Sequence, residues 1–151
     1  TVSPYLGPES LEQTVATALE NQRGLFILSA TSNTEAPRIQ SAQSQGRSVA
    51  RIVFDYATSH SKGEIGSVGV VFGATVDTAH AGIDLFTPPR IPMLVPGFGS
   101  QGVSLSEARS VLQMFSPVSI CSVSRSVAGI SKEGLSERIR FSKSELEVGL
   151  L

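Results

Sequence analysis

The 151-residue sequence contains a single cysteine, Cys121, and no long apolar run. One cysteine excludes an intrachain disulfide and fits a reducing compartment, so we expect a cytoplasmic protein. Cys121 lies in an apolar segment and is expected to pack in the core. Because no apolar run reaches the roughly 18 residues that cross a bilayer, no membrane segment is predicted.

Basic charge and metal ligands are also scarce. The formal net charge is −1, whereas a nucleic-acid-binding domain usually carries a basic stripe, so no nucleic-acid partner is predicted. For the two histidines, His60 and His80, we identify no cysteine or carboxylate partner at ligand spacing. We therefore predict no metal site.

What the sequence does contain is an alternation of apolar and amphipathic segments. Hydrophobic residues make up 40% of the chain, which is enough for one core. Apolar segments without polar alternation predict buried strands, and this pattern is typical of an α/β fold with a parallel sheet covered by helices. The strands are predicted at residues 25–30, 67–72, 93–95 and 118–123, after the end of an earlier strand at 1–3.

Helices are predicted between these strands from capping signals and periodicity. Two capping boxes, Ser10 with Gln13 and Ser104 with Glu107, mark helix starts. After a break at Gly46, apolar residues at helical spacing predict a helix through residues 49–56. A weaker helix is predicted at 76–84, and a last one runs through 135–146.

A glycine-rich turn follows the third of the four strands. Gly97, Gly99 and Gly102 come after Pro96, which ends the strand, and a helical segment follows them. A strand, a glycine turn and a helix start can direct backbone N–H groups at an anion, and phosphate is the obvious candidate. Gln101 lies in the same turn, and its amide can both donate and accept hydrogen bonds.

Arg125 comes directly after the last predicted strand, beside serines. Ligands bind at the carboxyl ends of parallel strands, and a guanidinium there could hold a phosphate through a bidentate pair of hydrogen bonds. The alternative is a solvent-exposed arginine without a ligand. If Arg125 follows strand 8 of a (β/α)8 barrel, the glycine turn follows strand 7, and phosphate sites of this fold are often built from those two loops.

Five motifs resemble, in order and spacing, the C-terminal half of orotidine 5′-phosphate decarboxylase, and most closely its actinobacterial subgroup. The motifs lie at residues 1–7, 31–33, 70–75, 94–102 and 124–125. The resemblance implies an α/β (β/α)8 TIM barrel, of which this chain supplies roughly the C-terminal half, from the end of strand 4 to helix 8. Residues 1–151 would then be the C-terminal part of a single barrel domain, without its N-terminal strands.

The resemblance also implies an activity and a set of binding residues. The family decarboxylates orotidine 5′-monophosphate to uridine 5′-monophosphate with no metal or organic cofactor, as a homodimer. In the family, the serine matching Ser32 reads the amide edge of the pyrimidine, and the arginine matching Arg125 holds the phosphate. The glutamine matching Gln101 bridges base and phosphate, and the backbone at Gly102 approaches the same anion. Further candidates for the site are Asn33, Pro96 and Ser124.

The sequence departs from the family in two places and lacks its catalytic array. Val103 stands where the family usually has a second glycine, and the tail after Ala128 matches no family motif. The family's catalytic lysines and aspartates lie on early strands, whereas the three lysines here are Lys62, in a loop, and Lys132 and Lys143, in the tail. We therefore predict no catalytic residue in this chain and no decarboxylation by the chain alone.

Two other functions are compatible with the same residues. One is a non-catalytic half barrel that binds a phosphometabolite. The other is a different phosphate-handling barrel lyase or isomerase, which would share Arg125 and the glycine turn but not residues 31–33 with Gln101. Half a barrel also leaves two open sheet edges, so we expect the isolated chain to be poorly soluble or self-associated.

Overall fold

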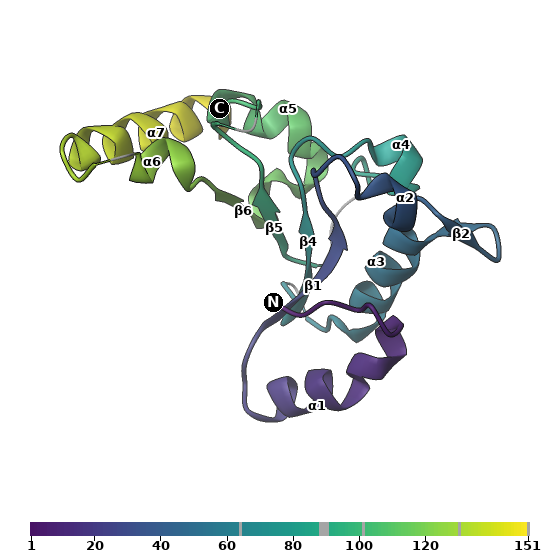
Figure 1. Cartoon of the computed structure of the whole chain (residues 1–151). Coiled ribbons are helices and arrows are strands. Elements are labelled where there is room, and N and C mark those ends of the chain that lie inside the picture. Colours follow the sequence, from purple (N-terminus) through teal and green to yellow (C-terminus); the bar gives the residue numbers. More distant parts are fainter. Residues whose placement is uncertain (64, 88–90, 101, 130, 151) are drawn as a thin grey trace.

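A computed structural model of the chain describes residues 1–63, 65–87, 91–100, 102–129 and 131–150. Its centre is a parallel sheet with the strand order β1-β4-β5-β6 (Figure 1). The strands are β1 (Leu25–Ala30), β4 (Val68–Phe72), β5 (Met93–Pro96) and β6 (Ser119–Ser122). At the free edge of β1, Val2 forms a parallel bridge with Ile27. The predicted parallel α/β architecture and the strand end at residues 1–3 are confirmed.

Helices and one hairpin connect the strands. In chain order they are η1 (Pro8–Leu11), α1 (Glu12–Glu20), α2 (Pro37–Gln40), the hairpin of β2 (Gln43–Ser44) and β3 (Arg47–Ser48), α3 (Val49–His60), α4 (Thr78–Ala81), η2 (Leu105–Glu107), α5 (Ala108–Leu112), η3 (Gln113–Val118), α6 (Arg125–Ala128) and α7 (Leu135–Leu150). Among the described residues, no helix is long and apolar enough to cross a lipid bilayer.

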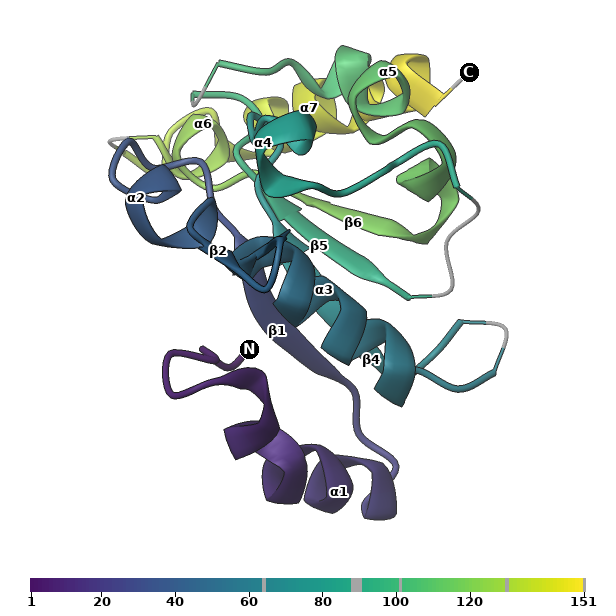
Figure 2. The ribbon, with the colours of Figure 1, turned by 90° about the vertical axis from the view of Figure 1, so that its right-hand side faces the viewer.

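One face of the sheet is sealed by α3. The strand register places Ile27 beside Val70 and Val70 beside Met93, and all three side chains are fully buried. On the same face, the Ser29 hydroxyl donates to the Ala50 carbonyl of α3 over 2.9 Å. Figure 2 shows α3 lying across this face. The continuous apolar strands are therefore explained by burial under helices.

The opposite face becomes more exposed toward β6. Its in-register row runs from Leu28 through Val71 and Leu94 to Ile120. Val71 is 5% exposed, whereas Ile120, on the strand at the edge of the sheet, is 54% exposed. The core of the molecule therefore lies around β1, β4 and β5 and thins out at β6.

The helix predictions are mostly confirmed, although the helix predicted at 76–84 is only the four-residue α4 and one predicted capping box is absent. The capping box of Ser104 and Glu107 is present. The box predicted at Ser10 and Gln13 was wrong, because Pro8 starts the helical segment earlier and the Ser10 hydroxyl donates to the Gly7 carbonyl. The hairpin of β2 and β3 was not predicted. Its two-residue turn has positive φ at both central positions, as in a type I′ turn.

Candidate functional site

The loops that leave the carboxyl ends of the four strands touch one another. Ser32, after β1, packs against Gly73, after β4, where an added Cβ would overlap the Ser32 hydroxyl oxygen. A Cβ on Gly97, after β5, would lie 3.2 Å from the same oxygen. The Ala74 amide also donates to the Pro96 carbonyl over 2.8 Å, which ties the second loop to the third. Ser32 therefore stands where three loops meet, and two of its neighbours have no side chain.

The Ser32 side chain is half-buried, and its hydroxyl makes no hydrogen bond with any residue that the structure describes. By contrast, the flanking Thr31 is fixed by Gln40, which accepts from the Thr31 amide and donates to the Thr31 hydroxyl, both over 2.8 Å. Thr31 in turn donates to Asn33 over 2.7 Å. The loop is thus held in place while one hydroxyl keeps its full hydrogen-bonding capacity.

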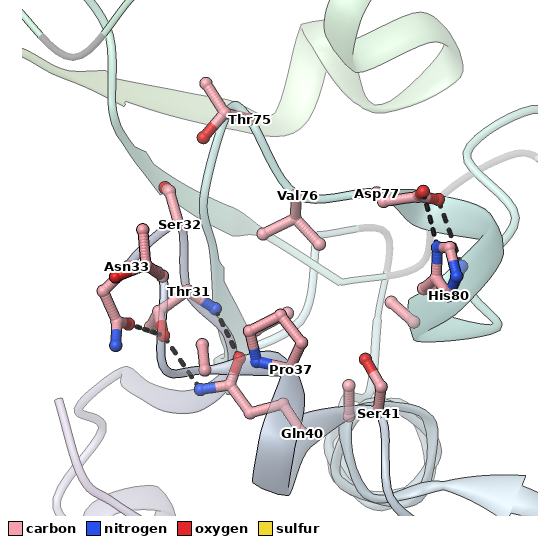
Figure 3. Close-up of a pocket in the computed structure, with 15 residues that line it drawn as sticks. Thr31, Ser32, Asn33, Pro37, Gln40, Ser41, Thr75, Val76, Asp77 and His80 are labelled. Carbon is pink, nitrogen blue, oxygen red and sulfur yellow. Dashed lines mark hydrogen bonds and ion pairs between the residues drawn. The ribbon is translucent and has the colours of Figure 1, made fainter.

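A cavity of about 350 Å³ opens beside this loop. Figure 3 shows residues 31–33 on one side of it and residues 75–77 with His80 on the other. Ser32 and Asn33 both line the cavity, whereas Pro96, Ser124 and Arg125 do not. The structure therefore brings together two of the predicted binding residues in one cavity and places Pro96, Gly102, Ser124 and Arg125 outside it.

The glycine turn after β5 has the left-handed backbone that its sequence predicts. The φ angles of Gly97, Gly99 and Gly102 are 111°, 75° and 114°, which favour glycine. The N–H of Gly99 donates to the Val103 carbonyl over 2.7 Å, and that of Gly102 donates to the Gly99 carbonyl over 3.1 Å. The expectation that the amides of this turn converge on an anion was therefore wrong for these two groups, because the turn itself uses them. No described residue other than its chain neighbours lies within 4 Å of the position that a Gly102 Cβ would take.

Val103 fits its position without strain. It forms a parallel bridge with Phe98, and it is not among the described residues with positive φ. The absence of the family's second glycine therefore has no conformational cost at this residue. Gln101, the other predicted residue of the turn, lies outside the described residues.

Arg125 is the first residue of α6, and its neighbour Ser126 packs against the glycine turn. A Cβ on Gly99 would lie 2.5 Å from the Ser126 hydroxyl oxygen. The Arg125 side chain is exposed, and its guanidinium forms no hydrogen bond or ion pair with the residues that the structure describes. Ser124 provides no side-chain cap for α6. The turn and the start of α6 are thus adjacent, as predicted, and the guanidinium is available to a ligand.

Sequence analysis missed two carboxylate partners of the histidines. His80 Nδ1 lies 2.6 Å from Asp77 Oδ2 at the cavity, and His60 Nε2 lies 3.2 Å from Glu12 Oε2. The side-chain hydrogen bond with His80 is the main cause that lowers the pKa of Asp77. The three-residue spacing of Asp77 and His80 was the available signal. In the described part of the chain, no group of three or more His, Cys, Asp or Glu side chains could hold a metal ion.

Cys121 and the lysines lie away from the cavity. Cys121 is half-buried and packs against the core as predicted, and burial raises the pKa of its thiol. Lys62, Lys132 and Lys143 are exposed, and none of them lines the cavity. The described residues therefore place no ammonium group beside Ser32.

Comparison with known proteins gives consistent matches. Residues 1–132 match the model of the orotidine 5′-phosphate decarboxylase / HUMPS family, so α7 lies beyond the matched region. An orotidine 5′-phosphate decarboxylase of Corynebacterium glutamicum strain R is 36% identical over 138 residues, covering 84% of this chain and 46% of that protein. One of Salinispora arenicola is 39% identical over 131 residues with the same coverage. The chain thus spans about half the length of the curated relatives that it matches.

Solved structures agree in fold. A putative orotidine 5′-phosphate decarboxylase of Streptomyces avermitilis superposes with a TM-score of 0.85 at 33% identity, covering 99% of this chain and 53% of that one. An orotidine 5′-monophosphate decarboxylase of Methanocaldococcus jannaschii, at 16% identity, superposes with a TM-score of 0.62 over 94% of this chain and 58% of that one. These neighbours are TIM barrels, and the parallel sheet with its helices is part of such a barrel. The fold class predicted from the sequence is confirmed.

Proposed function

The chain belongs to the orotidine 5′-phosphate decarboxylase / HUMPS family, and from that premise we propose that it is the substrate-binding part of an orotidine 5′-monophosphate decarboxylase. The complete enzyme is a carboxy-lyase that forms uridine 5′-monophosphate. The observation that carries the proposal is the contact of Ser32 with the glycine turn, together with the contact of that turn with Ser126 beside Arg125. Two polar groups that have no hydrogen-bond partner among the described residues, the Ser32 hydroxyl and the Arg125 guanidinium, thus lie on either side of one turn.

Each of these groups suits a different part of the substrate. The Ser32 hydroxyl can both donate and accept, which matches the N–H and C=O of a pyrimidine amide edge. The Arg125 guanidinium can bind a phosphate through two parallel hydrogen bonds. Gln101 would bridge base and phosphate. Gly102 would lie beside the anion without donating its N–H, because that N–H is bonded to the Gly99 carbonyl. Asn33, Pro96 and Ser124 would complete the surroundings of the ligand.

The chemical step needs groups from elsewhere in the complete enzyme. When the bond between the ring and its carboxylate breaks, CO2 leaves and the electron pair stays on the ring carbon, which must then take a proton. Proton transfer needs an acid within hydrogen-bond reach, and no described lysine lies at the cavity. We therefore infer that this chain supplies binding and that the catalytic acid lies in the part of the enzyme that it does not span. No metal or organic cofactor enters this proposal.

For the complete enzyme we also infer a homodimer in the cytoplasm, with no nucleic-acid or membrane partner. The dimer follows from the family resemblance. The location is supported by the single half-buried cysteine, which suits a reducing compartment.

Complementation tests the proposal. The chain is co-expressed with the part of the Corynebacterium glutamicum relative that it does not cover, and decarboxylation of orotidine 5′-monophosphate is measured. We expect no turnover by the chain alone and measurable turnover by the pair. In the pair, Arg125→Ala should lower kcat/KM by the equivalent of about 2–4 kcal/mol, because one partner of a charge-assisted contact is removed.

Arg140→Ala is the matched control, because the Arg140 side chain is exposed on α7 and forms no hydrogen bond or ion pair with the described residues. Turnover by the chain alone would contradict the inferred division between binding and chemistry. A pair that binds uridine 5′-monophosphate without turnover would favour the non-catalytic half barrel. A pair that binds other sugar phosphates equally well would favour a different phosphate-handling barrel enzyme.

A further inference from the structure

Helix α7 lies beyond the family match, yet it packs on both segments that flank the glycine turn. Figure 1 shows α7 running alongside α6 toward α5. It contacts η2, which follows the turn, and α6, which carries Arg125. Leu146 packs against the core and Gly149 is buried, whereas Ile139, Phe141 and Val148 are each at least half exposed. Apolar packing therefore secures the C-terminal part of α7, and its N-terminal part, beside α6, relies mainly on polar contacts.

Arg138 provides most of these polar contacts. Its guanidinium donates to four backbone carbonyls that precede α7 in the chain. The acceptors are Val127 (2.7 Å), Ala128 (3.1 Å), Ser131 (2.8 Å) and Glu133 (2.6 Å). Two of them are the last residues of α6. One half-buried side chain thus binds the C-terminal end of α6 and the loop behind it.

Helix α6 depends on such support. It has only four residues, and an isolated single turn is unstable, because ordering its backbone costs more free energy than its first hydrogen bond contributes. No side chain caps its N-terminus, whereas the Arg138 side chain donates hydrogen bonds to its C-terminal carbonyls. A cation at the C-terminal carbonyls satisfies them and complements the helix dipole. Gly129 permits this contact, because a Cβ there would lie 3.0 Å from Arg138 Cζ.

A second anchor fixes α7 to the other side of the glycine turn. Glu145 accepts a hydrogen bond from the Ser104 hydroxyl over 2.8 Å, and Ser104 is the N-cap of η2. Near the end of α7, Gly149 lies so close to η2 that an added Cβ would overlap the Leu105 carbonyl oxygen. The helix therefore holds α6 and η2 in one fixed arrangement with the turn between them.

We propose that Arg138 is a positioning residue for phosphate binding. It fixes α6 and so directs the Arg125 guanidinium at the glycine turn, without touching the ligand itself. This inference rests on the proposed function, because it assigns the phosphate to Arg125. It gives the tail after Ala128, for which the sequence offered no role, a place in substrate binding.

The first test needs no ligand and uses the full chain. The amides of Val127, Ala128 and Gly129 are bonded within α6 and its end. In Arg138→Ala their hydrogen exchange should accelerate about tenfold or more, as local opening becomes easier, while exchange in α3 stays unchanged. Arg138→Lys should recover only part of the protection, because a single ammonium cannot reproduce the planar guanidinium with its several donors.

Arg140→Ala, which removes the same charge from the same helix, should leave the exchange rates of these amides unchanged. Unchanged exchange in Arg138→Ala would overturn the proposal.

The second test measures the affinity of the same variants for uridine 5′-monophosphate and for uridine. Arg138→Ala should weaken the binding of uridine 5′-monophosphate about tenfold, which is the effect of losing about one hydrogen bond to the phosphate. It should leave the affinity for uridine unchanged. Equal losses for both ligands, or no loss for the nucleotide, would overturn a positioning role. A wild-type chain that binds neither ligand, alone or in the complemented pair, would contradict the proposed function instead, while exchange would still show whether Arg138 holds α6.

Discussion

The β1–α3 and β6–α6–α7 regions of this molecule are stabilised in different ways. β1 and β4 carry fully buried side chains beneath α3, a twelve-residue helix with a side-chain N-cap. β6 has no buried residue, and the helix after it has four residues and no side-chain cap. The first region is held by apolar burial over many residues. The second depends on a few hydrogen bonds, and Arg138 makes four of them.

This difference determines how each region responds to substitution. Hydrophobic stabilisation is spread over the buried area, so no single hydrogen bond decides it. A region held by one guanidinium loses several contacts at once when that side chain is removed. The predicted binding residues are divided between the two regions, with Ser32 on the first and Arg125 on the second.

The strongest test of the comparison exchanges one isoleucine in each region for alanine. Ile27 is fully buried and Ile120 is 54% exposed, although both lie on the same sheet. Ile27→Ala should lower the free energy of unfolding by about 2–5 kcal/mol, through lost burial and the cavity left behind. Ile120→Ala should change it by no more than about 0.5 kcal/mol. Urea denaturation measures both, and equal losses would show that β6 is buried in solution.

A smaller effect should separate two serines at helix N-caps. The buried Ser48 accepts from the Arg51 amide over 2.9 Å and donates to the Ala81 carbonyl over 2.5 Å. Ser48→Ala should therefore cost about 1–2 kcal/mol, because a cap and a buried hydrogen bond are lost together. The exposed Ser124 makes no such bond at α6, and Ser124→Ala should stay within about 0.5 kcal/mol. Thermal melts of the two variants measure both losses of stability. A larger loss for Ser124→Ala than for Ser48→Ala would contradict the comparison.

The smallest expected effect concerns pH and belongs to the first region. Burial, followed by the hydrogen bond to Glu12 and its charge, raises the pKa of Tyr56 to about 12. Because the folded pKa lies above the ordinary value of about 10, this stabilisation is complete below pH 10. It is lost as pH rises from 10 toward 12, since the unfolded chain releases the proton first.

Denaturation curves across this pH range test the assignment. The wild type should lose stability more steeply above pH 10 than Tyr56→Phe, which has no phenol to ionise. Glu12→Gln removes the hydrogen-bonding charge, so the decline that Tyr56 causes should become shallower. Identical curves for the wild type and Tyr56→Phe would show that Tyr56 does not couple folding to pH.

Much of the first region could be predicted from the sequence, because burial leaves a readable pattern. The continuous apolar residues of β1 and β4 and the helical period of α3 each follow directly from what they pack against. The hairpin of β2 and β3 was missed, because strands of two residues are too short to show alternation. Its Gln45-Gly46 turn is also a weaker signal than Asn-Gly.

The candidate site was predicted in outline only. Position after a strand correctly placed Ser32 and the glycine turn at one edge of the sheet, because parallel strands end together. The amides of Gly99 and Gly102 could not be assigned, since their partners lie within the turn and depend on its φ angles. The role of Arg138 was also hidden, because its acceptors are backbone carbonyls, which carry no sequence signature.

The strand order β1-β4-β5-β6 is also the order in which the strands are synthesised. Each strand after β1 pairs with the strand that is synthesised just before it in this sheet, so none of these pairings depends on a later segment. Pairing with the neighbouring unit closes a shorter loop than pairing with a more distant one, which lowers the entropic cost of the pairing. As the chain leaves the ribosome, the sheet can therefore grow by one strand at a time, in the N-to-C direction in which domains fold during synthesis. The segment that Arg138 secures is the last to join, so the proposed phosphate-binding edge is completed only when α7 emerges.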